Sequence, residues 1–208
     1  MSNYLAIATV TIALRDLLQD AALSAVAGAV VTTQQPEQVQ ATGQNKAGIN
    51  ISLYQVSPNP DWVNVDLPTR NGNGSLMQRP LTGLDLHYLL SFYGSDMEME
   101  PQRLLGSTIM YLHAQPFLPF AAIQHAVDNT GYLAQSDLLQ QTERVKFSPL
   151  NLSLEELSKL WSVFYQIPYT LSVAYRASVI IIEASEEITQ TKPVLQPVIK
   201  VTPEGTAS

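Results

Sequence analysis

The residue pair best placed for chemistry in this sequence is Asp85 and His87, which lie two positions apart in the run LTGLDLHYLLSFYG. Residues two apart on a strand face the same way, so the carboxylate could orient the imidazole. A small metal- or His-dependent enzyme that uses this pair is therefore one open interpretation. A metal centre would need further ligands, and no HxH, HExxH or carboxylate triad is present. Without a nucleophile or an oxyanion donor, the pair is more typical of a polar contact on a sheet face.

The other residue types that commonly perform catalysis have structural explanations. His113 and His125 fall on or near predicted helices, and no GxSxG elbow presents a serine. The chain has no cysteine, which excludes a thiol nucleophile, a thiolate metal cluster and disulfides. The Asn-Gly-rich segment Pro68–Pro80 lacks the GK[ST] of a phosphate loop. We therefore expect no catalytic, cofactor-binding or metal-binding residue and no cofactor.

Aromatic residues gather late in the chain and could form a platform for stacked bases: Trp161, Phe164, Tyr165, Tyr169 and Tyr175. Such a platform works together with a basic groove that follows the phosphates. The net charge is −7, however, and the sequence has no run of Lys or Arg. Nucleic-acid binding is therefore not expected, and the aromatic set indicates core and interface packing.

The N-terminal segment predicts an amphipathic helix. Ser2 or Asn3 can serve as its N-cap, and apolar residues recur at helical spacing from Ile7 to Ala21. It lacks the positive start of a signal peptide, and Arg15 and Asp16 interrupt its apolar run. No segment of the sequence is long and uninterrupted enough to span a bilayer, so direct membrane insertion is not expected.

Strand patterns recur along the rest of the chain. Leu81–Gly94 is the most strand-like run, and it becomes apolar on both faces, which predicts a central strand covered on both sides. We expect the other strands in AVVTTQQP and at 49–56, 62–66, 143–147 and 169–183.

Helix signals separate these strands. Ser95 or Asp96 is expected to cap a helix whose apolar stripe is Leu104, Leu105, Thr108, Ile109 and Leu112, and a short helix is expected over 119–127. In LSLEELSKLW, Ser153 with Glu156 predicts a capping box. The buried stripe of that helix is expected at Leu157, Leu160, Trp161 and Phe164.

This interleaving predicts an α/β (α+β) fold, a mixed sheet flanked by several helices. We expect one domain over residues 1–185 and an extended, proline-rich tail over 186–208. Only 14% of the residues are charged, which suits a subunit packed against others. A generic homo-oligomeric binding module is a further open interpretation.

Three segments in combination resemble one protein family: GLDLHYLLSFYG, RLLGSTIMYLHAQP and LSLEELSKLWSVFYQIPYTLSVAY. They are similar to segments of the cap, or tail-terminator, proteins of contractile injection systems of the antifeeding-prophage and virulence-cassette type. NYLAIATVTIALRDLL and INISLYQVSPNP fit the same pattern, so the resemblance extends over most of the domain.

The resemblance implies a structural protein and not an enzyme. Six copies would form a ring at the baseplate-distal end of a phage-tail-like particle, end the polymerisation of the inner tube and bind the last sheath layer. The partners implied are the other copies of a homohexamer, the sheath protein and the inner tube protein. Assembly would take place in the cytoplasm, in a particle that is either released or membrane-anchored.

We expect contacts in the ring or with the sheath to use the edge of the last strand, where another chain can add a strand, and the tail. The interface residues of this hypothesis lie in both segments: Tyr169, Leu171, Val173, Tyr175, Val179, Ile181, Val194 and Val198.

Overall fold

The computed structural model describes residues 2–36, 46–63, 79–164 and 167–184, so the expected tail over 186–208 lies outside the described residues. Its five strands form one sheet in the order β1-β2-β3-β5-β4. β1 runs parallel to β2 and every other neighbouring pair is antiparallel, which confirms the predicted mixed sheet. The strands are β1 (Val30–Thr32), β2 (Gly48–Pro58), β3 (Leu81–Tyr93), β4 (Lys146–Leu150) and β5 (Ser172–Glu183).

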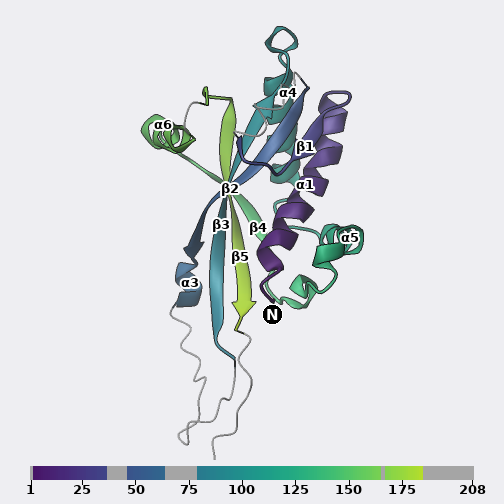
Figure 1. Cartoon of the computed structure of the whole chain (residues 1–208), viewed down its shortest axis with the longest axis vertical. Coiled ribbons are helices and arrows are strands. Elements are labelled where there is room, and N and C mark those ends of the chain that lie inside the picture. The colour runs from purple at the N-terminus through teal and green to yellow at the C-terminus, as the bar shows by residue number, and fades with distance from the viewer. Residues whose placement is uncertain (1, 37–45, 64–78, 165–166, 185–208) are drawn as a thin grey trace, which may run out of the picture.

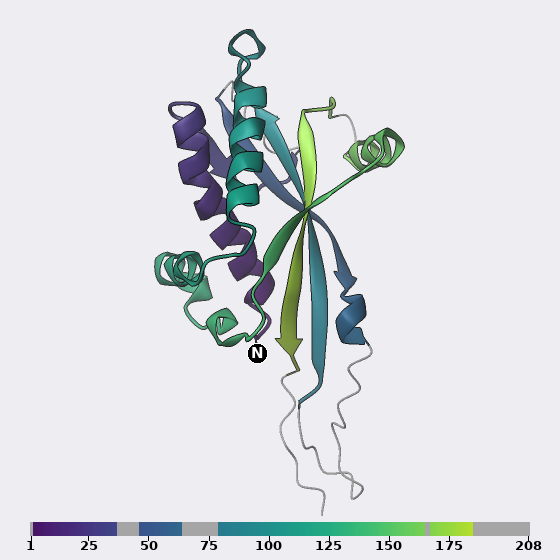
Figure 2. The same cartoon turned by 180° about the vertical axis from the view of Figure 1, so that it is seen from behind.

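In the described part of the chain five α-helices flank the sheet, and they are unequally divided between its faces. α1, α4 and α5 lie together on one side, whereas α3 and α6 lie on the other (Figures 1 and 2). The helices are α1 (Ala6–Ala25), α3 (Pro60–Val63), α4 (Glu100–Ala114), α5 (Phe120–Asn129) and α6 (Leu154–Val163). Three short 3-10 helices are η1 (Asp96–Glu98), η2 (Gly131–Leu133) and η3 (Leu138–Gln140).

The core lies between α1 and the sheet. Leu14 and Leu18 of α1 are fully buried, as are Leu86 and Tyr88 of β3. The Tyr88 hydroxyl is within 2.8 Å of the Thr11 Oγ1, so the buried phenol keeps a polar partner. Burial of the ring raises the pKa of Tyr88. Because β3 lies between β2 and β5 and is buried on both faces towards its end, the prediction of a central strand is confirmed.

The beginning of α1 differs from the prediction. The N-cap position is Leu5, which makes no side-chain cap, so the expectation of Ser2 or Asn3 as N-cap is wrong. Ser2 is instead part of the sheet: its N–H donates to Ile181 O at 3.1 Å, and its carbonyl accepts from Glu183 N at 2.9 Å. Asn3 Oδ1 accepts from Leu5 N at 2.9 Å, one residue before the helix begins.

A predicted strand over 62–66 is wrong where the structure describes it. Trp62 belongs to α3, because Asn59 Oδ1 accepts from Asp61 N at 3.0 Å and Pro60 sits at the first helical position. Residues 64–66 lie outside the described part of the chain.

The expected cap of α4 is also wrong. Ser95 precedes the separate turn η1, to which Asp96 belongs, and α4 begins only at Glu100, after Met99 in a left-handed conformation (φ 52°). Glu100 Oε2 accepts from Ser95 N at 2.7 Å, which fixes this turn. Along α4 the predicted stripe is buried at Leu104, Thr108 and Leu112. Leu105 is half-buried, and Ile109 is 44% exposed.

Two later strands begin further along the chain than predicted. β4 begins at Lys146 and not at residue 143; just before the strand, Gln141 Nε2 donates to Glu143 O at 2.6 Å. β5 begins at Ser172 and not at Tyr169. The helix expected over 119–127 is confirmed as α5, one residue later at its start.

Candidate interaction surface

Asp85 and His87 both lie on β3, but their side chains contact different partners. The buried Asp85 carboxylate accepts from Asn59 Nδ2 at 2.8 Å and lies 3.7 Å from Arg176 Nη1. His87 Nε2 lies 2.9 Å from Ser57 Oγ. The two side chains thus tie β3 to β5 and to β2, which is a structural role.

The electrostatics of His87 agree with that role. Burial is the main cause that lowers its pKa; the Asp85 carboxylate opposes this shift, and the Arg176 guanidinium adds to it. Burial therefore favours the neutral form of the ring. Among the described residues, no group of three or more His, Asp or Glu side chains is arranged to hold a metal ion. His113 lies on α4, and His125 Nδ1 on α5 lies 3.4 Å from Asp16 Oδ2.

The prediction that β5 offers a free edge is wrong, because β5 lies between β3 and β4. β4 pairs with Ala174–Ser178, and beyond that point the Gln141 side chain takes over. Its Oε1 accepts from Ile181 N at 2.8 Å, and its Nε2 donates to Val179 O at 2.8 Å. Gln141 and Ser2 therefore occupy the backbone groups of Val179, Ile181 and Glu183 on the side of β5 that β4 leaves uncovered. We call this part of the strand the closed half of β5.

The two outermost strands are also protected. On β1, Gln19 Oε1 accepts from Val31 N at 2.9 Å, and its Nε2 donates to Ala29 O at 2.9 Å. On β4, Phe147 N donates to Pro116 O at 2.7 Å, and Pro149 has no N–H to offer. Covered edges and edge prolines are the usual means by which proteins prevent unwanted strand addition.

The outer half of β2 is different. β1 pairs with β2 only over Gly48–Asn50, so no described strand pairs with the outer side of residues 51–58. Gln55 is exposed there, and Val56 is 43% exposed. A hollow of about 340 Å³ lies beside this edge, lined on its apolar side by Ala8, Ile12, Ile51 and Leu53. We call residues 51–58 the open edge.

A second hollow of about 440 Å³ lies between the C-terminal half of α4 and strands β4 and β5; we call it the α4–β4 groove. Apolar side chains form most of it, and the Lys146 ammonium and the His113 imidazole also line it. Two of the predicted interface residues, Val173 and Tyr175, line it. Its other members are Ile109, Leu112, Pro116, Phe147, Ser148 and Pro149.

Beside the groove, two cations rest on aromatic rings. The Arg144 guanidinium lies 5.1 Å from the centroid of Phe117 and 5.9 Å from that of Phe120, and Lys146 Nζ lies 5.8 Å from Phe117. Within the described ranges, neither cation is within ion-pair distance of a carboxylate. Phe117 and Phe120 are 40% and 50% exposed, so the cluster faces outward.

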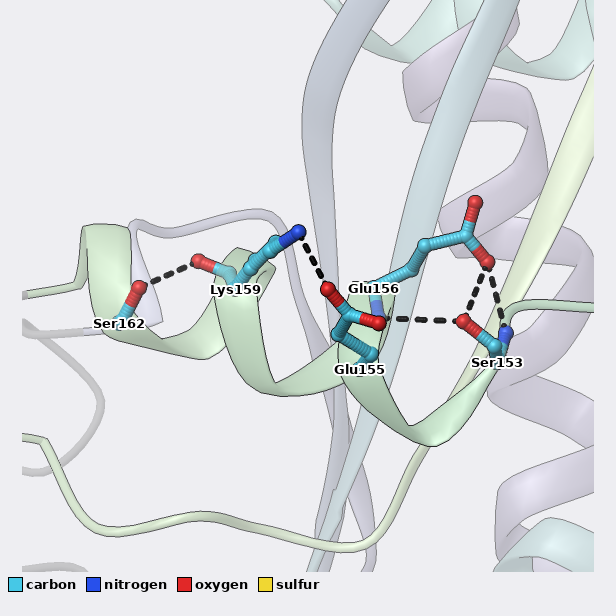
Figure 3. Close-up of polar contacts among 5 residues, drawn as sticks. All are labelled: Ser153, Glu155, Glu156, Lys159 and Ser162. Carbon is cyan, nitrogen blue, oxygen red and sulfur yellow. Dashed lines mark hydrogen bonds and ion pairs between the residues drawn. The ribbon is translucent and has the colours of Figure 1, made fainter.

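α6 begins with a side-chain cap of its own and contacts the sheet through Trp161, whose Nε1 donates to Ser172 Oγ at 3.1 Å. Figure 3 shows the predicted capping box, which is confirmed: Ser153 Oγ accepts from Glu156 N at 3.2 Å, and Glu156 Oε2 accepts from Ser153 N at 2.8 Å. These bonds lower the pKa of Glu156, the backbone N–H of Ser153 being the main cause. Of the predicted stripe, Trp161 is buried as expected, and Leu157, Leu160 and Phe164 are half-buried on a helix that lies to one side of the sheet (Figure 1).

The remaining predicted interface residues divide by exposure. Tyr169 is 59% exposed and packs edge-on against Trp161, with ring centroids 5.7 Å apart. Leu171 and Val179 are half-buried, and Ile181 is buried in the closed half of β5. Val194, Val198 and the aromatic Tyr165 lie outside the described residues.

Sequence reasoning missed Gln141, Gln19 and the cation–aromatic cluster. None of these has a local signal, because the segment that each one contacts lies ten or more positions away along the chain. In the described part of the chain, no helix combines the length and the apolarity needed to cross a membrane.

Comparison with protein families gives a match over residues 9–196 to the family described as the Pvc16 N-terminal domain. No curated protein sequence matches the chain.

Two similar solved structures share the fold at 17% sequence identity. One is the sheath/tube terminator of an extracellular contractile injection system, PVC, in the extended state, with a TM-score of 0.59 over 97% of this chain and 64% of that one. The other is the tube-terminating cap of the anti-feeding prophage, with a TM-score of 0.54 over 90% of this chain and 60% of that one. The chain thus spans less than two thirds of the length of each.

Proposed function

This chain belongs to the Pvc16 N-terminal domain family, and on that premise we propose that it is a structural cap, or tail terminator, of a contractile injection particle. The observation that carries the proposal is the family match over nearly the whole chain. It is supported by the fold shared with a sheath/tube terminator and a tube-terminating cap. The resemblance drawn from the sequence alone is confirmed at the level of the family.

In the proposed particle, six copies form a ring on the baseplate-distal end of the inner tube and stop its polymerisation. A ring needs two different patches that meet head to tail. The α4–β4 groove supplies one patch of the kind required, because Val173 and Tyr175 line a hollow beside exposed cations. The predicted interface residues Tyr169 and Leu171 remain part of this proposal.

The same ring binds the last sheath layer. We place that contact on the open edge, since Val56 and its neighbours offer the outer side of a strand to an added chain. The closed half of β5, with Val179 and Ile181, is not available for this role. Residues 186–208, which include Val194 and Val198, are proposed as an extended tail that adds contacts outside the domain.

The proposal includes no catalytic step and no cofactor. It is supported by the contacts of Asp85 and His87, which hold strands together. Assembly of the ring is proposed to take place in the cytoplasm, before the particle is released or anchored.

Particle length tests the proposal. Particles assembled without this chain are expected to carry tubes and sheaths of broadly variable length, and adding the chain back is expected to restore one length, measured by negative-stain electron microscopy. A length distribution that does not depend on the chain would overturn the cap function. Truncation after Ser185 tests the tail: unchanged ring formation and capping would rule out its proposed role.

A further inference from the structure

The loop between β3 and α4 carries an exposed apolar side chain between acids. We call Ser95–Met99 the acidic tip; its sequence is SDMEM, and all five residues are exposed. Met97 is 97% exposed, and Met99 is 58% exposed. The tip forms the upper end of the molecule, above α4 in Figure 1.

The acidic tip has a defined backbone. Met99 N donates to Asp96 O at 3.3 Å, and Glu100 N donates to Ser95 O at 3.1 Å. The Glu100 carboxylate holds Ser95 N from the helix side. A side chain on such a preformed turn loses less conformational entropy on docking than one on a loose loop. Met97 is also unbranched and adaptable, so it can fill a hollow of irregular shape.

The α4–β4 groove has the complementary character. It is a largely apolar hollow of about 440 Å³ with Lys146 in its wall, and Arg144 lies beside Phe117 next to it. A partner group that suits it combines an apolar side chain with carboxylates on either side. In the acidic tip, Asp96 and Glu98 flank Met97 in that arrangement.

One copy cannot join its own tip to its own groove. The tip ends at Met99, just before α4 begins at Glu100, and the groove residue Ile109 lies nine residues after Glu100 on that helix. With a rise of about 1.5 Å per residue, roughly 13 Å of helix separates them. The contact must therefore be between copies, and because the two patches differ it is head to tail, the type of contact that closes a ring.

We propose that the acidic tip of one copy docks in the α4–β4 groove of the next, with Met97 in the apolar hollow and Asp96 and Glu98 facing Lys146 and Arg144. The proposal rests on the proposed ring and names its subunit contact. With a net charge of −7 the copies repel at long range, so a local pairing of opposite charges also sets the orientation in which they meet.

Cysteine cross-linking tests the contact directly, because the chain has no cysteine of its own. Met97→Cys with Ile109→Cys in one chain is expected to give a ladder of covalent oligomers under oxidation, both in concentrated purified protein and in assembled particles. Within one chain these positions are too far apart for a disulfide, which needs Cα atoms roughly 4.4–6.8 Å apart. Met97→Cys with Leu154→Cys is the matched control, since Leu154 is 83% exposed on α6 and outside the groove.

Charge reversal gives a second measurement. Asp96→Lys with Glu98→Lys, or Arg144→Glu with Lys146→Glu, is expected to weaken association between copies about tenfold, measured by native mass spectrometry or sedimentation. All four changes together are expected to restore it to within about threefold of the original. Glu155→Lys on α6 is the control and is expected to leave association unchanged.

The outcomes separate this contact from the cap function. A ladder no stronger than that of the control pair, or four combined reversals that rescue nothing, would overturn the docking of Met97. Particles whose length the chain still limits, but in which Met97 and Ile109 do not cross-link, would overturn this contact and leave the cap function standing. Variable length with a clear ladder would overturn the cap function and leave the contact standing.

Discussion

β5 and the outer half of β2 belong to long strands of the same sheet, yet within the described residues β5 has backbone partners on both sides and the outer half of β2 has a neighbouring strand on one side. The backbone of β5 is taken up by β3, β4, Ser2 and the Gln141 side chain. The outer side of β2 beyond Asn50 has no described strand beside it. The difference shows that the hydrophobicity of a strand does not reveal whether its edge is free; this depends on which backbone groups other residues already use.

The largest expected effect comes from opening the closed strand. Gln141→Ala leaves Ile181 N and Val179 O without their buried partners, which should lower the free energy of unfolding by about 3 kcal/mol. Chemical denaturation measures this loss. Gln55→Ala on the open edge is the matched control and should change stability by less than about 0.5 kcal/mol. Equal losses in the two variants would contradict the division between the strands.

Blocking the open edge should affect binding and not folding. Val56→Lys places a charge on the free edge, which should weaken binding to sheath ends about tenfold while unfolding stays within about 0.5 kcal/mol of the original. Val30→Lys is the control: Val30 is similarly exposed, at 46%, but the backbone beside it on β1 is held by Gln19. Binding that weakens equally in both variants would argue against strand addition at β2.

The capping box should matter only locally. Ser153→Ala removes the acceptor for Glu156 N, so opening of α6 should become easier by about 1 kcal/mol, seen as faster amide hydrogen exchange within α6. Because α6 stands away from the sheet, exchange in β3 should not change. Ser162→Ala, which removes a bond from Ser162 Oγ to Lys159 O near the other end of the helix (Figure 3), serves for comparison. Loss of protection in β3 would show that α6 is coupled to the core.

The smallest expected effect is a dependence of stability on pH through the contact of His87 with Ser57. The folded pKa of His87 lies below its ordinary value of about 6.5, so the unfolded chain binds the proton more readily. The contribution of His87 to the free energy of unfolding should therefore be fully present above about pH 6.5. It should be lost as the pH drops from about 6.5 through the lower folded pKa. His87→Gln should flatten this part of the stability profile. A profile that the substitution does not alter would contradict burial as the dominant cause.

Local signals in the sequence predicted the elements well where a few adjacent residues control the backbone. Ser153 with Glu156 predicts the beginning of α6 correctly because both partners lie within four residues. The apolar pattern around Trp62 predicts a strand, but Asn59 and Pro60 just before it start a helical turn. These two residues are a local signal for the helix.

The arrangement of strands could not be predicted in the same way. Gln141 acts on Ile181, 40 positions later, and Ser2 reaches the same strand from the other end of the chain. No pattern in the sequence near β5 indicates that Gln141 and Ser2 hydrogen-bond to the backbone of this strand. The open edge on β2 and the α4–β4 groove likewise arise from packing between distant segments, so the predicted interface at β5 had to be revised.

If the chain caps one end of the particle as a ring, it must be found there in assembled particles. Electron cryomicroscopy of particles carrying a C-terminally tagged chain can locate the tag and determine the symmetry of its density. One ring with six-fold symmetry is expected at the baseplate-distal end, beyond the last sheath layer. Density along the sheath, at the baseplate or nowhere on the particle would contradict it.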